Sequence, residues 1–243
     1  MRNAEIQPFD TEYLVKTAAD AGFELTEQQT EKFKTYYEVL ADYNNRVNLT
    51  AVTEPKAVAV THFVDSLTLL KANIPQNARL ADIGAGAGFP SVPVKIFRND
   101  ISLTLIDSLN KRVAFLEHLS EKLGLPFDAF HMRAEDAGRK KELREQFDVV
   151  CARGVAKIYL LCEYCLPLVK TGGVLVAMKG PSPEEEIETA ERAMHELGAK
   201  LKRVESFSLP DTSKRSLVII EKTSTTPAKY PRQSAKIAKS PLI

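Results

Sequence analysis

Short apolar runs alternate with helical stretches along the middle of this 243-residue chain. The apolar runs cover residues 79–83, 102–106, 127–132, 147–152 and 173–179. Alternation of this kind predicts a parallel sheet with helices on both faces, because parallel strands need a crossover element between them. We therefore expect an α/β protein.

Two more strands are expected over residues 203–209 and 215–221, joined by the turn at Pro210-Asp211, which leaves no room for a helix. Strands joined this directly must be antiparallel. Five alternating strands followed by an antiparallel pair are typical of the Rossmann-like class I S-adenosylmethionine-dependent methyltransferases. The predicted fold is a seven-stranded mixed sheet with helices on both faces and an N-terminal helical cap.

The cap is predicted from the first 78 residues, which have helical periodicity and almost no strand pattern. Aromatic residues share one face of a run from Glu27 to Tyr43, and a second helical run covers Lys56 to Lys71. We expect a cap at residues 1–78 and a methyltransferase domain at residues 79–243 that ends in a basic tail.

The segment Leu80–Pro90 is predicted to be a buried strand that ends in a glycine-rich turn and opens a helix. Its glycines have the spacing G-x-G-x-G: Gly84, Gly86 and Gly88. Dinucleotide sites use G-x-G-x-x-G, and the phosphate loop of nucleoside triphosphate sites is absent. The next strand ends in Asp107, whose carboxylate could accept both hydroxyls of a ribose. These features fit S-adenosylmethionine, which has a ribose but no phosphate, although a plain connector between strand and helix would give the same turn.

Composition indicates a soluble cytoplasmic protein without a metal site. No apolar run reaches the roughly 18 residues of a membrane span, and the N-terminus lacks the apolar core of a signal peptide. The chain has three cysteines, an odd number that argues against a disulfide framework. Cys162 and Cys165 form a C-x-x-C that could be redox-active or half of a zinc site. Because it lies in an apolar helix and no partner motif follows, core packing is the preferred interpretation.

The C-terminal tail is basic and contains no acid after residue 221. Its basic residues are Lys222, Lys229, Arg232, Lys236 and Lys239. Such a strip could contact phosphates, or it could be a solvated and partly disordered terminus. The charges alone do not separate these two interpretations.

Longer motifs occur in order along nearly the whole chain. They are Tyr43–Thr50, His62–Ser66, Asp82–Pro90, Asp107–Arg112, Arg133–Glu135, Phe147–Ala156 and Gly172–Gly180. Together they closely resemble the RsmG family, also called GidB, of bacterial small-subunit ribosomal RNA methyltransferases. The resemblance implies methyl transfer from S-adenosylmethionine to N7 of a guanine in the decoding-region loop of 16S ribosomal RNA.

The resemblance also implies roles for particular residues. Gly84, Phe89, Ala134, Glu135 and Arg153 would form the cofactor site, with Ala134 and Glu135 at the adenine. The glycine pattern adds Gly86, Gly88 and Asp107 to this site. Asn48 and His62 are expected to contact the substrate, which is 16S ribosomal RNA or the small ribosomal subunit.

Arg153 follows the fourth predicted strand and has more than one possible role. It could bind the cofactor carboxylate, a phosphate or O6 of the guanine, but not N7, which must stay free to attack the methyl group. A structural salt bridge is the alternative.

The expected chemistry needs no general base, because guanine N7 carries a lone pair and no proton. In agreement, the end of the fourth strand reads Cys151-Ala-Arg-Gly154, where amino-methylating enzymes have the motif [DNS]-P-P-[YFW]. Cys151 lacks the neighbours that would activate a nucleophilic thiol. We therefore assign no catalytic residue.

Three alternative functions stay open at this point. The chain could methylate a small metabolite, could bind cofactor and RNA without catalysis, or could be a nicotinamide-dependent oxidoreductase.

Overall fold

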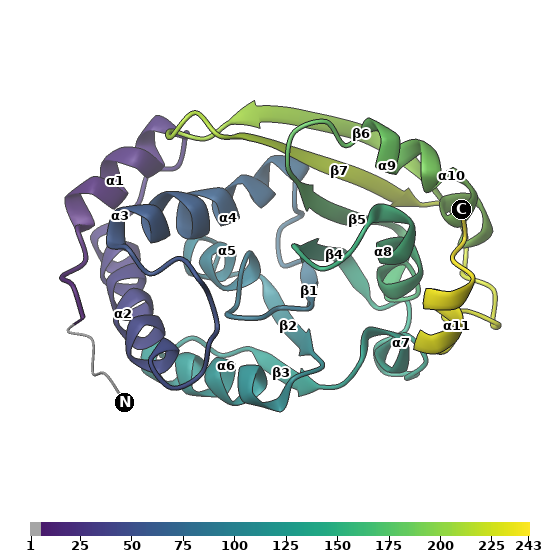
Figure 1. Ribbon diagram of the computed structural model, residues 1–243, viewed down its shortest axis with the longest axis horizontal. Helices are drawn as coiled ribbons and strands as arrows, with labels where there is room; N and C mark the ends of the chain where they lie inside the picture. Colours follow the sequence, from purple (N-terminus) through teal and green to yellow (C-terminus); the bar gives the residue numbers. More distant parts are fainter. Residues whose placement is uncertain (1–5) are drawn as a thin grey trace.

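The computed structural model describes residues 6–243, which form a seven-stranded sheet with helices on both faces (Figure 1). The strands are β1 (Arg79–Ile83), β2 (Ser102–Asp107), β3 (Asp128–His131), β4 (Phe147–Arg153), β5 (Val169–Lys179), β6 (Ala199–Ser208) and β7 (Lys214–Lys222). The α-helices are α1 (Thr11–Asp20), α2 (Glu27–Asn44), α3 (Pro55–Val58), α4 (Asp65–Leu67), α5 (Ser91–Phe97), α6 (Asn110–Leu123), α7 (Ala134–Ala137), α8 (Ile158–Cys165), α9 (Glu184–Thr189), α10 (Glu191–Glu196) and α11 (Ser234–Lys239).

The sheet has the order β3-β2-β1-β4-β5-β7-β6. β1 to β5 pair in parallel, whereas β7 is antiparallel to both β5 and β6. This confirms the predicted mixed sheet, including the antiparallel pair at its end. The chief differences in bounds are that β5 begins at Val169 and β6 at Ala199, because both strands extend past the apolar runs that signalled them.

The strand order reverses between β1 and β4, which lie side by side although they are far apart in sequence. In open α/β sheets, ligands bind at such a switch point, beyond the carboxyl ends of the strands. The loops after β1 and β4 are therefore where a site is expected. They contain the glycine turn and the segment that follows Arg153.

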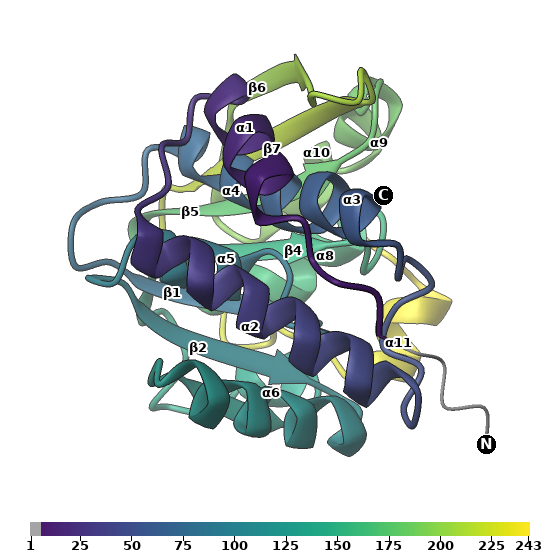
Figure 2. The same cartoon turned by 90° about the vertical axis from the view of Figure 1, so that its left-hand side faces the viewer.

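Alternate residues of the strands inside the sheet face two different hydrophobic clusters. Leu80 of β1 packs in the cluster formed with α1 to α6, whereas Ala81 and Ile83 pack in the cluster formed with α7, α8 and α10. Figure 2 shows the first face, with α2 crossing in front of the sheet. The predicted boundary at residue 78 stays a prediction, but side chains on both sides of it share the first cluster.

The second helical run is more irregular than its sequence indicates. It is continuous from Pro55 to Ala72, but residues Ala59–Val64 form a π-helical turn and Thr68–Ala72 a 3-10 turn. Turns of the π type occur frequently at functional sites, because they re-aim side chains. Here the π-helical turn contains His62 and ends beside Asp65. Within residues 6–243, no helix is both long and apolar enough to cross a membrane.

The glycine turn is attached to the N-terminal helices by close packing. The hydroxyl of Tyr36 in α2 donates a hydrogen bond to the carbonyl of Ala87, and its ring stacks on Phe89 with centroids 5.2 Å apart. A Cβ atom at Gly88 would lie 2.7 Å from the Tyr36 hydroxyl and 2.8 Å from Val92. Gly88 therefore allows the helix and the turn to approach this closely.

Replacement of Gly88 by alanine should destabilise the fold through both backbone and packing. The φ of Gly88 is +90°, and an alanine there would also overlap Tyr36. Gly22 is a matched control, because its φ is +89° and a Cβ atom at this position would have no neighbour within 4 Å. In urea unfolding, Gly22→Ala should cost about 1–2 kcal/mol, and Gly88→Ala about 1–3 kcal/mol more. Equal losses in the two variants would show that the packing against Tyr36 is unimportant.

Candidate active site

Two adjoining cavities lie at the carboxyl edge of the sheet, around the switch point. The smaller has a volume of about 170 Å³ and is lined by residues that follow β1, β2 and β3. The larger, of about 800 Å³, is lined by residues from the second helical run, the loop after β4 and the ends of β5, β6 and β7. Val155, in the loop after β4, lines both cavities.

The smaller cavity brings together three of the residues that the resemblance assigns to the cofactor. Gly84, Ala134 and Glu135 all line it. Glu135 is buried, and its carboxylate accepts a hydrogen bond from the hydroxyl of Ser234 in the C-terminal tail. A Cβ atom at Gly84 would lie 2.7 Å from the Val155 side chain, so a glycine is needed for the loop after β4 to pack against the turn.

Asp107 lies beneath the cavity wall rather than on it, and protein groups already hold its carboxylate. Oδ2 accepts hydrogen bonds from the Gly86 N–H at 2.9 Å and from Arg112 at 3.2 Å. Oδ1 accepts one from the Leu109 N–H at 2.9 Å. A carboxylate has about four acceptor positions, so Oδ1 retains capacity for one further donor. Asp107 thus organises the glycine turn and has room for one ribose hydroxyl rather than both. Ribose binding by Asp107 stays a prediction.

Phe89 and Gly88 do not line either cavity. Phe89 is only 7% exposed and lies between the rings of Tyr36 and His62. Its position is explained by packing between the glycine turn and the N-terminal helices.

The larger cavity is built around a buried carboxylate that binds two arginines. Asp65 is 4% exposed. Its Oδ2 accepts a hydrogen bond from Arg153 Nη1 at 2.7 Å, and its Oδ1 accepts one from Arg215 Nε at 3.1 Å. Arg153 also donates to the Thr61 carbonyl at 3.1 Å, and its guanidinium lies 5.2 Å from the centre of the Phe89 ring. The structural ion pair considered for Arg153 is therefore present, and the residue also lines the cavity.

His62 lines the same cavity as a neutral side chain. Its ring stacks on Phe89 with centroids 4.5 Å apart, and Nε2 lies 2.9 Å from the Thr50 hydroxyl. Burial, together with the positive charge of Arg153, lowers the pKa of His62 to about 4. At neutral pH the ring therefore carries no charge.

Asn48 is exposed and lines neither cavity. Its neighbour in the motif, Asn44, organises the loop: Asn44 Oδ1 accepts hydrogen bonds from the N–H groups of Leu49 and Thr50. The loop in turn positions the Thr50 hydroxyl against His62. Substrate contact by Asn48 stays a prediction.

Asp82, at the end of β1, is a fully buried acid with a free acceptor. Its Oδ2 accepts a hydrogen bond from the Ser91 hydroxyl at 2.5 Å, whereas Oδ1 has no partner within the part of the chain that the structure describes. Burial raises the pKa of Asp82 to about 7. A buried acceptor without a donor is costly, so this oxygen is suited to an amino group or a water beneath the glycine turn.

The three cysteines are buried in the core. Cys162 and Cys165 are fully buried in the cluster between α8 and the sheet, which confirms core packing. Burial raises the pKa of the Cys151 thiol well above its ordinary value, so the reactive thiolate is disfavoured. Among residues 6–243, no group of three His, Cys, Asp or Glu side chains is arranged to hold a metal ion.

Both interpretations of the basic tail are wrong for Lys222 and Arg232. The Lys222 side chain has no exposed surface and donates a hydrogen bond to Glu145 at 3.1 Å. Arg232 donates to both carboxylate oxygens of Glu163, at 2.8 and 2.6 Å. These cations neutralise acids of the protein, which the sequence alone does not reveal. Lys229, Lys236 and Lys239 are exposed.

Sequence reasoning missed Arg215, Val155 and Ser234, and it gave Asp65 no role of its own. Asp65 was visible as part of the motif His62–Ser66, and its position one turn after His62 hinted at a shared face. Arg215 and Ser234 have no comparable signal, because their place depends on how the β6-β7 hairpin and the tail dock.

Comparison with known proteins supports the motif-based resemblance. The family described as "GidB: rRNA small subunit methyltransferase G" matches residues 29–218. The ribosomal RNA small subunit methyltransferase G of Desulforamulus reducens is 50% identical over 232 residues, which cover 94% of this chain and 97% of that protein.

Solved structures are similar in fold at low sequence identity. The precorrin-6y C5,15-methyltransferase of Geobacter metallireducens has a TM-score of 0.50 and 14% identity, and the match covers 77% of this chain and 98% of that chain. TYW2 of M. jannaschii in complex with AdoMet has a TM-score of 0.51 and 16% identity, with 66% and 76% covered. The predicted Rossmann-like methyltransferase fold is confirmed.

The low pKa of His62 predicts a specific dependence of stability on pH. The folded-state pKa of about 4 lies below the ordinary value of 6.5, so on acidification the unfolded chain takes up the proton first. The stability contributed by neutral His62 is complete above pH 6.5 and is lost as the pH falls toward 4.

The variant His62→Phe keeps a ring against Phe89 but does not titrate. Between pH 7 and pH 5, urea unfolding should show that the wild-type protein loses about 2 kcal/mol more than the variant. Asp82 titrates with the opposite sign but is present in both proteins, so the comparison removes it. The same loss in both proteins would contradict the assigned pKa.

Proposed function

The chain belongs to the rRNA small subunit methyltransferase G family, and we propose that it transfers a methyl group from S-adenosylmethionine to N7 of a guanine in the decoding-region loop of 16S ribosomal RNA. The observation that carries the proposal is the pair of cavities that meet at Val155. One has acceptors suited to the cofactor, and the other is large and basic. Methyl transfer requires two such sites in contact.

The smaller cavity and the turn above it fit S-adenosylmethionine by their chemistry. The cofactor has hydrogen-bond donors along its length: an ammonium group, ribose hydroxyls and the adenine amino group. The chain offers carboxylate acceptors in the same region: Oδ1 of Asp82, which has no partner among residues 6–243, the remaining position on Asp107, and Glu135. When bound, the cofactor supplies a methyl group that its sulfonium charge makes electrophilic.

Arg153 is placed to orient the target base in the larger cavity. Within residues 6–243, both of its hydrogen bonds leave from Nη1, so Nε and Nη2 are available to a ligand. A donor to guanine O6 would hold the major-groove edge of the base while N7 stays free. Asp65 fixes the guanidinium, and its negative charge also moderates the repulsion between Arg153 and the cationic product base.

The residues around the cavity position the reactants and need not move a proton at N7. His62 is neutral at physiological pH, and its Nε2 is engaged with Thr50. Orientation of two reactants can supply roughly 7–11 kcal/mol of the barrier reduction. The structure supports this mode of catalysis, because the side chains at the cavity are fixed by buried partners.

Positive charge around the larger cavity favours a nucleic acid over a small neutral metabolite. Arg153, Lys157, Lys179 and Arg215 line it, against the carboxylates of Asp65 and Glu186. Loop nucleotides of RNA are the cheapest to turn out of their stack into such a cavity. We expect the reaction to occur in the cytoplasm, where ribosomal subunits are found.

Transfer of labelled methyl groups tests the proposal. The purified protein with tritiated S-adenosylmethionine should label small subunits from a strain that lacks the gene, or their naked 16S RNA, and not subunits from the parent strain. Cleavage at N7-methylguanine followed by reverse transcription should give one stop, in the decoding-region loop. Turnover on free metabolites that is indifferent to salt would favour a metabolite methyltransferase, since RNA binding weakens steeply as salt rises.

Arg215 should be needed for this activity although no motif identifies it. Arg215→Gln removes a cation from the larger cavity and one partner of Asp65, and should lower kcat/KM for the subunit about tenfold or more. Lys200→Gln removes an exposed cation at the far end of the same hairpin, where Lys200 pairs with Glu221, and should leave kcat/KM unchanged. Equal effects of the two substitutions would exclude a local role for Arg215.

A further inference from the structure

The tail after β7 folds back over the helices on the second face of the sheet. Arg232 is the main anchor: its guanidinium and its backbone N–H all donate to Glu163 of α8, a carboxylate with only 1% of its side chain exposed. Ile237 and Leu242 are buried, and Tyr230 and Leu242 belong to the second hydrophobic cluster. The tail is therefore an integral part of the fold.

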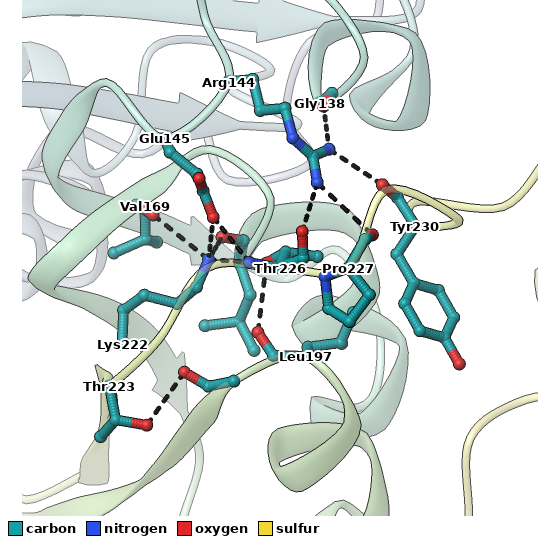
Figure 3. A network of polar contacts seen from close by, with 12 residues as sticks. Gly138, Arg144, Glu145, Val169, Leu197, Lys222, Thr223, Thr226, Pro227 and Tyr230 are labelled. Carbon is teal, nitrogen blue, oxygen red and sulfur yellow. Dashed lines mark hydrogen bonds and ion pairs between the residues drawn. The ribbon is translucent and has the colours of Figure 1, made fainter.

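A second anchor, Arg144, holds the part of the tail that precedes Arg232 (Figure 3). Arg144 donates hydrogen bonds to the carbonyls of Thr226, Tyr230 and Gly138, at 2.8 to 2.9 Å. Beside it, Glu145 accepts from Lys222 and from the Thr226 N–H at 2.7 Å. These bonds fix the path of the backbone between β7 and α11.

The anchored tail reaches the wall of the smaller cavity at Ser234. Ser234, the first residue of α11, lines this cavity together with Glu135 and Arg133. Arg133 Nη1 lies 3.3 Å from the Ser234 hydroxyl oxygen, and the hydroxyl in turn donates to Glu135 Oε1. Arg133 thus donates to the hydroxyl oxygen of Ser234. The hydroxyl proton of Ser234 therefore points to the Glu135 carboxylate. Such a chain of hydrogen bonds strengthens each member.

We propose that Ser234 is a positioning residue for cofactor binding: the docked tail holds Glu135 so that its second oxygen faces the adenosine. The proposal rests on the proposed function, in which Glu135 binds the adenine end of S-adenosylmethionine. One oxygen of the carboxylate is held by Ser234, and the other is left for a donor of the ligand. The C-terminal tail therefore contributes to the cofactor site.

Calorimetry with S-adenosylhomocysteine tests this role without requiring turnover. Ser234→Ala should raise the Kd about five- to tenfold, which lies within the range expected for the net contribution of one hydrogen bond. Ser234→Thr keeps the hydroxyl and should bind within about twofold of wild type. Ser240→Ala is the matched control, because this serine lies in the same tail and its side chain is exposed.

Two further measurements separate positioning from simple folding. At saturating S-adenosylmethionine, Ser234→Ala should keep the wild-type kcat for subunit methylation, with only the KM for the cofactor raised. In the wild-type protein, S-adenosylhomocysteine should slow amide hydrogen exchange in residues 232–239, because ligand binding stabilises the docked tail.

An unchanged Kd in Ser234→Ala, or an equal rise in Ser240→Ala, would overturn the proposal while leaving the proposed function intact. Failure of the wild-type protein to bind S-adenosylhomocysteine would instead overturn the proposed function itself.

Discussion

The buried ion pairs of Asp65 join the parts of the molecule on which the site depends. This carboxylate comes from the second helical run, and its partners Arg153 and Arg215 come from the end of β4 and the start of β7. Taking such charges out of water is expensive, and removal of one partner typically costs about 3–5 kcal/mol. The arrangement therefore persists only while all three elements are docked. It fixes the N-terminal helices, the switch point and the antiparallel hairpin around one cavity.

The glycine turn links a second set of elements by packing rather than by charge. Phe89 is enclosed by Tyr36 and His62, and Gly88 provides the space for Tyr36. Only part of the G-x-G-x-G pattern therefore faces the smaller cavity, namely Gly84. The same short motif connects the sheet to the N-terminal helices and shapes the site. The aromatic ring of Phe89 suits this connection, because it stacks on the rings of Tyr36 and His62.

Local and repeating features were predictable from the sequence, whereas features made by docking were not. The seven strands follow from apolar runs, and the antiparallel pair follows from a turn too short for a helix. The resemblance placed Ala134 and Glu135 in one site, and both line the smaller cavity. The π-helical turn at Ala59–Val64 has no signature in residue spacing. Arg215, Lys222 and Arg232 were missed or misjudged because the partner of a charged residue depends on tertiary contacts.

The contribution of Ser234 to the cavity wall has a consequence for biosynthesis. The carbonyl of Thr226 is bound by Arg144, which is 82 residues earlier in the chain, and Ser234 meets Glu135 across 99 residues. Domains generally begin to fold while the chain is still being made. The sheet and both hydrophobic clusters can thus begin to assemble on the translating ribosome, but the smaller cavity gains its last wall only when the C-terminal residues emerge. A chain cut short before α11 would have every strand of the fold and an incomplete pocket.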